Sequence, residues 1–488
     1  MNRFFLRLGV FAFCAVFAAA CSVDTAPDAS APNILFLFAD DLQADAIGAY
    51  GNGYIRTPNL DRLVEDGYSF RRAYNMGAHH GAVCAPSRAM LMSGRSLFRV
   101  YDNLDSVRTF PEILREADYR TFGTGKWHQS RSSFARSFGE GNAVFFGGMA
   151  DHFNVPLEHL QADRSFTEPV TQSFSTTRFA DAAVDFLKDY GASDRATPFL
   201  AYVSFTVPHD PRTPPASHAA DYAGTSMPLP PNYLPVHPFH NGRMTVRDEV
   251  LAGWPRRPDV IRDQLAEYYG LITHMDEEIG RILSELDAQG LAENTMIVFT
   301  SDHGLAVGQH GLLGKQNLYE HSAKTPLVVQ GPGIPQGETH ELVYLHDLFA
   351  TVLGMAGVEA PAGVDAQDLS ALWKGEDASA RDHLFLAYED LHRAVVEDRW
   401  KLIRYPRIHY TQLFNLHADP YELRNLADDP AYAEEQTRLM RLLETAQQEA
   451  GDPHPLTAET RMPMEFDYSD IVRTPDRHQP EEVVQKYF

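Results

Sequence analysis

Short runs rich in apolar residues, each followed by polar residues, recur over the first two thirds of the chain. They lie at residues 33–39, 119–124, 199–205 and 294–300. Runs of this length and composition are typical of strands that are buried on both faces of a sheet. Between them, apolar residues repeat every three or four positions over 176–190 and 264–289, which predicts two amphipathic helices. This alternation predicts an α/β fold in which helices sandwich a large, mostly parallel sheet.

The pattern changes near residue 376, where the strand-like runs become shorter and more closely spaced. Four of them, at 383–388, 393–396, 400–405 and 413–416, precede a helical pattern over 431–449. Such spacing favours an antiparallel meander. We therefore expect a catalytic domain over 33–375 and a C-terminal subdomain over 376–488, made of a smaller antiparallel sheet plus a helix. Residues 211–258, rich in proline and polar residues, are expected to form an extended insertion that shapes specificity.

The N-terminal segment has the features of an export signal. In residues 1–20, basic residues precede an apolar stretch, and small residues form a cleavage site at Ala18–Ala20. Residues 21–32 are a linker rich in Ala, Pro, Asp and Ser. Cys21 directly follows the alanines, as in a bacterial lipoprotein box, although Ala18 stands where leucine is usual, so simple cleavage is the alternative. We expect export to the periplasm or cell surface, with a lipid anchor on Cys21 if the protein is an outer-membrane lipoprotein.

The amino-acid composition indicates a globular protein and excludes some classes of partner. The 488 residues are 44% hydrophobic, as in a globular protein with a sizeable core. The formal net charge of −24 argues against a nucleic acid as partner. Of three cysteines, two lie in or beside the export signal, which leaves Cys84 as the single thiol of the folded part. An unpaired cysteine in an oxidising compartment indicates special chemistry.

Cys84 begins the sequence Cys84-Ala85-Pro86-Ser87-Arg88, which runs into an apolar segment of helical character. Pro86 suits the first turn of a helix, because its missing N–H is not needed there. Cys84 would then lie just before a helix N-terminus, where backbone donors favour an anionic group. Taken alone, the pattern fits equally a small buried thiol at a junction between loop and helix.

Polar residues with catalytic potential follow each buried strand. Asp40 and Asp41 follow the first, Lys126 and His128 the second, His209 the third, and Asp302 and His303 the fourth. Ligands bind at the carboxyl ends of strands in open α/β sheets, so we expect these side chains to meet. Adjacent carboxylates could instead cap a helix, but in this setting metal binding is the preferred interpretation.

Five motifs, which follow one another along the chain in the family's order, resemble those of the type I sulfatases of the alkaline phosphatase superfamily, most closely the bacterial carbohydrate sulfatases. The five motifs are Asp40-Asp41, Cys84–Arg88, Gly125-Lys126-Trp127-His128, Pro208-His209-Asp210-Pro211, and Asp302-His303 with the downstream Lys315. The resemblance implies an alkaline-phosphatase-like fold over nearly the whole mature chain. It also implies that a formylglycine-generating enzyme oxidises Cys84 to formylglycine (3-oxoalanine). Two departures are Gln129-Ser130, where Leu-Gly is usual, and His303, where asparagine is common.

The resemblance also implies a role for each site residue. Ca²⁺ is expected to be bound by oxygen-rich ligands, namely Asp40, Asp41, Asp302 and His303, with the modified Cys84. Arg88 is expected to favour the ionised nucleophile, and Lys126 and Lys315 to bind sulfate oxygens. His209 is expected to protonate the departing sugar oxygen, and His128 to accept the proton whose removal releases sulfate.

The expected activity is hydrolysis of sulfate monoesters on saccharides from a sulfated polysaccharide, either algal, such as ulvan, or a glycosaminoglycan. Five further residues are weaker candidates for substrate contacts: His79, His80, His152, Arg212 and Gln316. One alternative is a formylglycine-dependent phosphonate or phosphodiester hydrolase of the same superfamily. A second alternative is a non-catalytic glycan-binding protein.

Overall fold

The structure of the protein is a computed structural model. It describes Met1 and residues 31–488, except 172, 194, 224–226 and 376–379. The expected export signal, Cys21 and most of the linker fall outside the described residues, so these features stay predictions. No helix in the described part of the chain is both long and apolar enough to cross a membrane.

An eight-stranded sheet forms the centre of the molecule, in the order β13-β2-β12-β10-β1-β9-β5-β6. The strands β10, β1, β9, β5 and β6 run parallel, and β12 is antiparallel to β10. The four predicted strands are therefore confirmed as the middle of the sheet, and the α/β fold with them. Their bounds are β1 Asn33–Asp40, β5 Arg120–Lys126, β9 Phe199–Pro208 and β10 Thr295–Ser301. The others are β2 Tyr68–Phe70, β6 Glu140–Phe145, β12 Leu327–Gln330 and β13 Gly337–Thr339.

The central strand β1 divides the apolar core into two halves. All eight of its residues are buried. Ile34, Phe36 and Phe38 belong to one apolar cluster, whereas Leu35, Leu37 and Ala39 belong to the other. Because successive side chains of a strand point to opposite faces, an uninterrupted apolar run fits only a strand covered on both sides.

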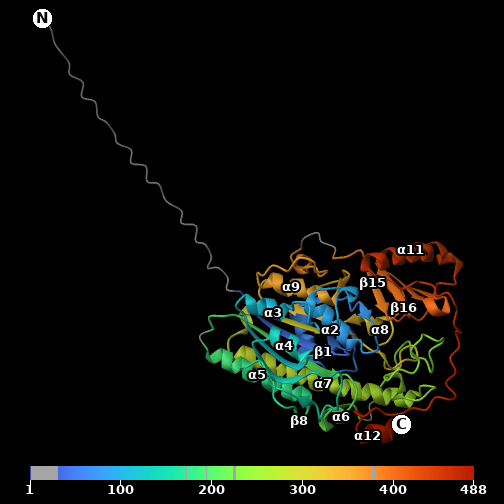
Figure 1. Ribbon diagram of the computed structural model, residues 1–488, viewed down its shortest axis with the longest axis horizontal. Coiled ribbons are helices and arrows are strands. Elements are labelled where there is room, and N and C mark those ends of the chain that lie inside the picture. The colour runs from blue at the N-terminus through green and yellow to red at the C-terminus, as the bar shows by residue number, and fades with distance from the viewer. Residues whose placement is uncertain (2–30, 172, 194, 224–226, 376–379) are drawn as a thin grey trace.

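Helices cover both faces of the sheet (Figure 1). The long helices α5 (Ser175–Ala192) and α7 (Pro258–Ala288) pack on the face of Leu35, together with α1 (Pro58–Asp66). On the opposite face lie α2 Cys84–Ser93, α3 Phe110–Glu116, α4 Arg131–Ser137 and α9 Leu348–Met355. The helix α7 begins six residues before its predicted start, because Pro258 occupies the first turn and the periodic apolar positions begin only later.

The predicted C-terminal meander is also confirmed. Four antiparallel strands, β15 His383–Tyr388, β16 His392–Glu397, β17 Trp400–Tyr405 and β18 Tyr410–Asn415, are covered by α11 (Ala433–Ala450). A fifth strand, β4 (Gly77–Ala78), pairs in parallel with β15. Gly77 has φ 122°, and a Cβ there would lie 1.7 Å from the Ala387 oxygen, so only glycine allows this pairing. The chain just before Cys84 is thus tied to the C-terminal sheet.

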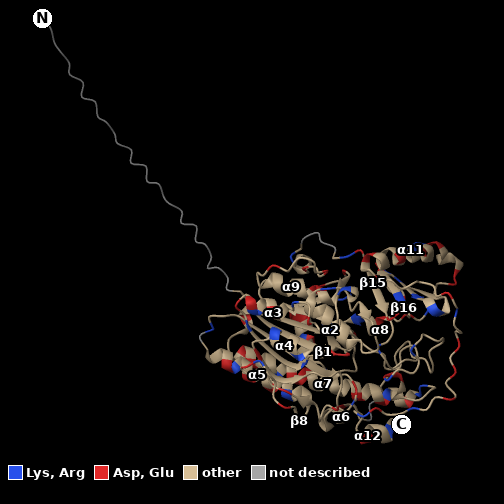
Figure 2. Cartoon of the chain, viewed as in Figure 1, with Lys and Arg blue, Asp and Glu red and all other residues tan. Residues whose placement is uncertain are grey.

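Smaller elements complete the fold. They are α6 Ala216–Tyr222, α8 Glu320–Ala323, α10 Ser370–Trp373, α12 Glu481–Tyr487, β3 Ala73–Tyr74, β7 Pro156–Leu157, β8 Val170–Thr171, β11 Lys324–Thr325 and β14 Val343–Tyr344. Apart from 224–226, which are not described, residues 211–258 carry little regular structure. After α11 the chain runs down the outside of the molecule to α12, near α7 (Figure 1). Figure 2 shows acidic and basic positions interspersed along the chain.

Candidate active site

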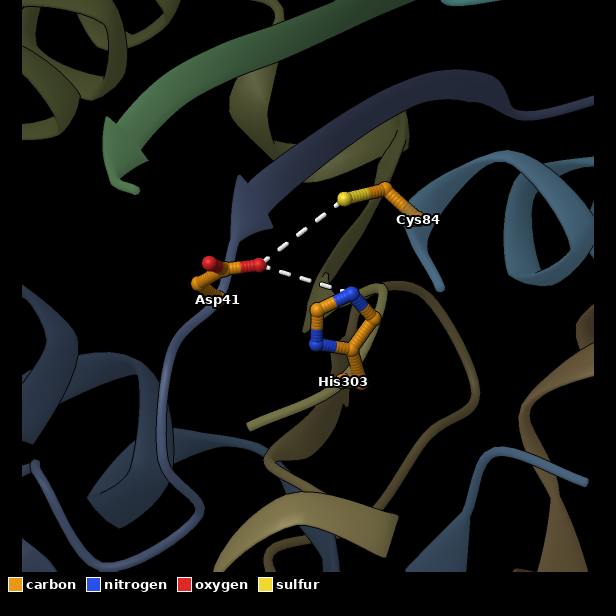
Figure 3. Close-up of side chains that lie close together, drawn as sticks. All are labelled: Asp41, Cys84 and His303. Carbon is orange, nitrogen blue, oxygen red and sulfur yellow. Dashed lines mark hydrogen bonds and ion pairs between the residues drawn. The ribbon is translucent and has the colours of Figure 1, made fainter. Parts of the chain in front are cut away.

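Cys84 is the first residue of α2 and lies at the carboxyl edge of the central sheet. Its side chain is 1% exposed. The thiol sulfur lies 3.2 Å from Lys315 Nζ and 3.9 Å from Asp41 Oδ1. Figure 3 shows that the side chains of Cys84 and His303 point toward Asp41, and that the three residues come from three separate segments. The isolated thiol of the sequence therefore lies inside a charged cluster.

Asp40 and Asp41 project differently from the end of β1. Asp41 has φ 68°, a left-handed backbone that residues other than glycine seldom adopt. Its N–H donates to Asp302 Oδ1 at 3.0 Å, which holds this turn. Asp40 Oδ2 accepts from Lys126 Nζ at 2.5 Å, and Asp41 accepts from Lys315 Nζ at 2.9 Å. Each carboxylate therefore faces its own lysine.

The pair Asp302 and His303 arrives beside these carboxylates because β10 is the parallel neighbour of β1. Asp302 Oδ2 accepts from Arg88 Nε at 3.2 Å, and His303 Nε2 lies 3.4 Å from Asp41 Oδ1. Burial disfavours the charged imidazole, but Asp302 and Asp41 outweigh it and raise the pKa of His303 to about 9.

The donor set fits a divalent cation. Asp40 Oδ1 and His303 Nε2 are buried without a hydrogen-bond partner. Burial also raises the pKa of Asp41 well above its usual range even though Lys315 and His303 oppose it, so the cost of burying this carboxylate is only partly offset. Two groups of possible ligands share Cys84. The first adds Asp41 and His303, and the second adds Asp40 and Asp302; within each group the ligand atoms lie within 4.8 Å of one another. Carboxylate oxygens favour a hard cation such as Ca²⁺.

A second group with suitable ligand types, His310, His321 and Glu422, lies near β17. Here Lys401 Nζ lies 3.0 Å from Glu422 Oε1 and 3.0 Å from Glu320 Oε1. The lysine already supplies the positive charge that this cluster needs, so we interpret it as a structural ion pair rather than a metal site.

Three cations surround the thiol: Arg88, Lys126 and Lys315. Arg88 is fixed by hydrogen bonds from Nη1 to the Lys126 carbonyl (2.8 Å) and to Ser204 Oγ (2.7 Å). Burial opposes their charge, but neighbouring carboxylates raise the pKa of both Arg88 and Lys315. Burial would likewise raise the pKa of the Cys84 thiol, yet Lys126 and Lys315 together lower it. The site therefore favours an anion at position 84 and around it.

Two histidines flank this cluster, each just after a strand. His209 Nδ1 bonds the Asp210 carbonyl at 2.7 Å, and its Nε2 lies 3.8 Å from Asp41 Oδ2. His128 has φ 62° and a buried Nδ1 with no hydrogen-bond partner. Burial, assisted by Lys315 at His209 and by Lys126 at His128, holds both pKa values well below the usual range. Both imidazoles are therefore neutral at pH 7 and can donate or accept a proton.

The weaker substrate candidates are engaged with the protein. His79 Nε2 lies 2.7 Å from the Leu97 carbonyl, and His80 Nε2 lies 2.5 Å from Asp102 Oδ2. Arg212 is buried and bonds Gln264 Oε1. Gln316 Nε2 donates to the Gly81 carbonyl and to Asp248. Arg212 nevertheless keeps Nε and Nη2 without a hydrogen-bond partner. A role of these four residues in substrate binding stays a prediction.

His152 lies behind the site rather than in it. It is 1% exposed, its Nε2 lies 2.8 Å from the His209 carbonyl, and its Nδ1 lies 3.2 Å from Thr206 Oγ1. Both ring nitrogens are thus occupied, and the structure assigns His152 to supporting His209. The sequence missed Ser204, which holds Arg88, and Arg247, which binds Asp210. Neither belongs to a recognisable motif, so no sequence signal marked them.

Comparisons with known proteins identify the family of the chain. A family model described as Sulfatase matches residues 32–358, and one described as N-sulphoglucosamine sulphohydrolase, C-terminal, matches residues 308–449. An N-acetylglucosamine-6-O-sulfatase of Bacteroides thetaiotaomicron is 27% identical and aligns over 91% of each chain. An ulvan-active sulfatase of Formosa agariphila is 26% identical over 88% of this chain and 84% of its own.

Solved structures share the fold. One, in complex with its substrate D-glucosamine-2-N,6-O-disulfate, superposes with a TM-score of 0.74 at 23% identity, covering 88% of this chain and 100% of that one. A phosphonate monoester hydrolase of Agrobacterium radiobacter gives a TM-score of 0.66 at 20% identity, covering 86% of this chain and 96% of that one. Because the sulfatase model spans more than half of the chain, the protein belongs to the sulfatase family and is a sulfuric ester hydrolase.

Proposed function

We propose that this sulfatase removes sulfate from saccharides of a sulfated polysaccharide, with a formylglycine made from Cys84 as its nucleophile. One observation carries the proposal. The Cys84 sulfur lies inside a buried cluster of three carboxylates and three cations, 3.2 Å from Lys315 Nζ. Such a cluster suits a tetrahedral anion held against a nucleophile, and it has no purpose in packing alone.

The relatives support a saccharide substrate. The N-acetylglucosamine-6-O-sulfatase and the ulvan-active sulfatase both align over most of this chain. A glycosaminoglycan fragment and an algal saccharide are therefore both candidate substrates. A panel of defined sulfated saccharides, with release of inorganic sulfate as the readout, tests this proposal. Activity on aryl sulfates but on no saccharide would contradict it.

We further propose that Ca²⁺ binds to Asp40, Asp41, Asp302 and His303 together with residue 84. Bound there, the cation neutralises charge on the sulfate oxygens. The unpartnered Asp40 Oδ1 and His303 Nε2 support this assignment. The formylglycine, when hydrated, supplies one hydroxyl to attack sulfur and a second through which sulfate is released.

Three cationic side chains stabilise negative charge during the reaction. Arg88, fixed by Ser204 and by the Lys126 carbonyl, favours the ionised form of the group at position 84. Lys126 and Lys315 bind the non-bridging oxygens of sulfate and stabilise the charge that develops on them.

Proton transfers fall to the two neutral histidines. His209 hydrogen-bonds the leaving sugar oxygen and protonates it, with His152 holding the backbone of His209 in place. His128 accepts the proton whose removal expels sulfate from residue 84. His128 follows β5 and His209 follows β9, the neighbouring strand, and these separate positions support a separate role for each histidine.

Substitution of Cys84 tests the nucleophile. Cys84→Ala should abolish turnover while the protein stays folded, since the residue contributes little packing volume. Mass spectrometry of the peptide that carries residue 84 should show an aldehyde in wild type produced with a formylglycine-generating enzyme. Full activity of a chain that retains an unmodified thiol would contradict the proposal.

A phosphonate or phosphodiester hydrolase is the second candidate, because phosphonate monoester hydrolases share the fold. Rates on matched aryl sulfates, phosphonates and phosphodiesters separate the two activities. A non-catalytic glycan-binding role has lost its support, since the chain belongs to an enzyme family.

We also propose export to the periplasm or cell surface, with Cys21 as the site of a lipid anchor. The support is the order of residues in the N-terminal segment. Incorporation of a labelled fatty acid into wild type, and its loss in Cys21→Ser, tests the anchor. A soluble, unlabelled wild-type protein in the periplasm would favour simple signal cleavage.

A further inference from the structure

A cavity of about 710 Å³ lies beside the catalytic cluster. One wall is the segment from Phe145 to Glu158, which follows β6, together with Arg131 of α4. The other wall is the C-terminal segment Arg477–Pro480. The cavity thus lies between two regions that are more than three hundred residues apart in the sequence, and its volume is in the range that holds a ligand larger than one sugar ring.

The first wall touches His128. Gly148, which lines the cavity, packs so closely on this histidine that a Cβ at Gly148 would lie 2.6 Å from His128 Nε2. Gly148, a single residue without a side chain, therefore separates the cavity from the imidazole that we assign to proton transfer.

The second wall is bound to the segment of His209. Gln479 Nε2 donates to Asp210 Oδ2 at 2.9 Å. Arg247 bridges the same carboxylate to the tail. Its Nη1 lies 2.9 Å from Asp210 Oδ1, and its Nε lies 2.8 Å from Asp476 Oδ2. Burial opposes ionisation of Asp210, yet Arg247 holds its pKa well below the usual range. A buried ion pair therefore fixes the tail against the residue that follows His209.

The tail is also anchored on both sides of this contact. Before it, Arg473 Nε bonds the Val250 carbonyl at 2.9 Å. After it, Tyr487 Oη donates to Glu267 Oε2 of α7 at 2.7 Å, and Lys486 Nζ lies 2.6 Å from the same glutamate. Residues 476–480 are thus a built wall of the cavity rather than a loose end.

The lining suits a saccharide. Phe146, which is half-buried, offers apolar surface to a sugar ring, and Asp151 and Asn154 offer acceptors for its hydroxyl groups. Arg131 is already paired with Glu158. Arg477, by contrast, is exposed: its Nε donates to His478 Nε2 at 3.1 Å, and it has no acidic partner among the described residues. It is the lining cation that is available to an acidic substituent.

We propose that this cavity, with the C-terminal segment 476–480 as one wall, is the subsite for the sugar residue that neighbours the sulfated one. Arg477 binds a carboxylate or sulfate on that residue. The proposal rests on the proposed saccharide sulfatase function and deepens it, because it makes an acidic oligosaccharide, rather than a single sulfated sugar, the preferred substrate.

The test compares Arg477→Ala with wild type on three substrates: a small aryl sulfate, a sulfated disaccharide with an acidic neighbouring residue, and its counterpart with a neutral neighbour. Loss of one charged hydrogen bond should raise KM for the acidic disaccharide about tenfold or more, with kcat little changed. KM for the other two substrates should change far less. Uronate and sulfated neighbours, run separately, distinguish the two sources of negative charge.

Arg461→Ala is the matched control. Arg461 is an exposed arginine of the same tail, and its side-chain hydrogen bonds within the described part of the chain go to the Ile408 carbonyl and Met464, which do not line the cavity. An unchanged KM in Arg477→Ala, or an equal rise for all three substrates, would overturn the subsite. If wild type hydrolyses the aryl sulfate but neither disaccharide, the saccharide function itself fails, and the subsite fails with it.

Discussion

At the scale of single residues, two members of the site adopt a left-handed backbone conformation. Asp41 and His128 have φ of 68° and 62°. Non-glycine residues in this region cost on the order of 1–3 kcal/mol and persist only where the surroundings enforce them. At Asp41 the hydrogen bond to Asp302 does so. These conformations direct each side chain away from its neighbour in sequence and toward the cluster.

Lys315 should be indispensable for turnover. Lys315→Met removes the ammonium group that contacts both Cys84 and Asp41. We expect kcat/KM on an aryl sulfate to fall about 10²–10³-fold, as when a preorganised charge donor is lost. Lys374→Met, at an exposed lysine, should leave kcat/KM unchanged. A fall of less than tenfold for Lys315→Met would remove this residue from the catalytic group.

His80 should contribute to stability only in acid. The hydrogen bond and charge of Asp102, against a smaller effect of burial, raise the pKa of His80. A raised pKa in the folded state means that the stabilisation is complete below the ordinary value of about 6.5 and disappears as pH rises above it. For this half-exposed pair we expect at most about 1 kcal/mol.

Urea unfolding of His80→Ala at about pH 5.5 and about pH 8.5 measures this difference, on either side of the ordinary histidine pKa. The variant should be less stable than wild type at the lower pH and equal to it at the higher pH. His417→Ala, at an exposed histidine without an ion pair among the described residues, should show no pH-dependent loss. The reverse pH dependence at position 80 would contradict the assignment.

Sequence patterns could predict which residues gather, but not how they are paired. The positions after the predicted strands indicate that Asp40, Lys126 and Asp302 lie close together. Cys84 and Lys315, by contrast, are expected there because of the resemblance to the sulfatases. Their roles stay proposals. That His152 would serve His209 rather than a substrate could not be foreseen, since the contact is to a backbone carbonyl. Arg247 stands in a segment without period or motif, and its importance arises only from tertiary contacts.

At the scale of elements, Gly125 shows how β5 delivers Lys126. Gly125 has φ 88°, and a Cβ there would lie 1.8 Å from the Ser204 carbonyl oxygen of the neighbouring strand β9. The pairing of β5 with β6 also shifts register between Gly123 and Gly125. A side chain at 125 would therefore separate the strands that carry Lys126 and His209.

Gly125→Ala should reduce both stability and activity. The backbone cost alone is about 1 kcal/mol, and the clash with Ser204 should bring the loss to about 3 kcal/mol or more. Gly363→Ala is the matched control, because Gly363 has φ 85° but nothing within 4 Å of its would-be Cβ. Denaturant unfolding and kcat of both variants separate the two contributions. Equal losses would show that the close approach of the strands is unimportant.

Long elements were predictable and short ones were not. Strands β1, β9 and β10 have seven or more residues, enough for an apolar run to be recognised. Strands β2 and β13, with three residues each, carry no pattern and are defined by their neighbours in the sheet. The two-residue strand β4 is the extreme case, since its pairing with β15 depends on the fold being formed.

At the scale of the whole molecule, β4 joins the two predicted domains into a single structure. The division of the chain at residue 376 stays a prediction, but the C-terminal sheet takes one edge strand from the segment that precedes Cys84. The C-terminal tail adds a second connection through Asp476 and Arg247. Both features are long-range contacts, which no local pattern in the sequence reveals.

Metal removal should affect the molecule as a whole. Chelation should abolish turnover and lower Tm, because a cation that binds only the folded chain stabilises it by mass action. Added Ca²⁺ should restore both, with Tm rising with the logarithm of its concentration. In Asp41→Asn, Tm should no longer respond to Ca²⁺. A Tm of wild type that ignores both chelator and Ca²⁺ would argue against a calcium site.

The burial of Cys84 orders events in time. All ten residues of α2, including Arg88, are buried in the finished fold, so the stretch from Cys84 to Arg88 offers nothing for another protein to grasp. In the mechanism proposed for this sulfatase, the formylglycine-generating enzyme must therefore bind the chain before the central sheet has folded. A chain that folds before Cys84 is oxidised should be stable but inactive. The yield of active enzyme should then depend on the rate of oxidation relative to the rate of folding.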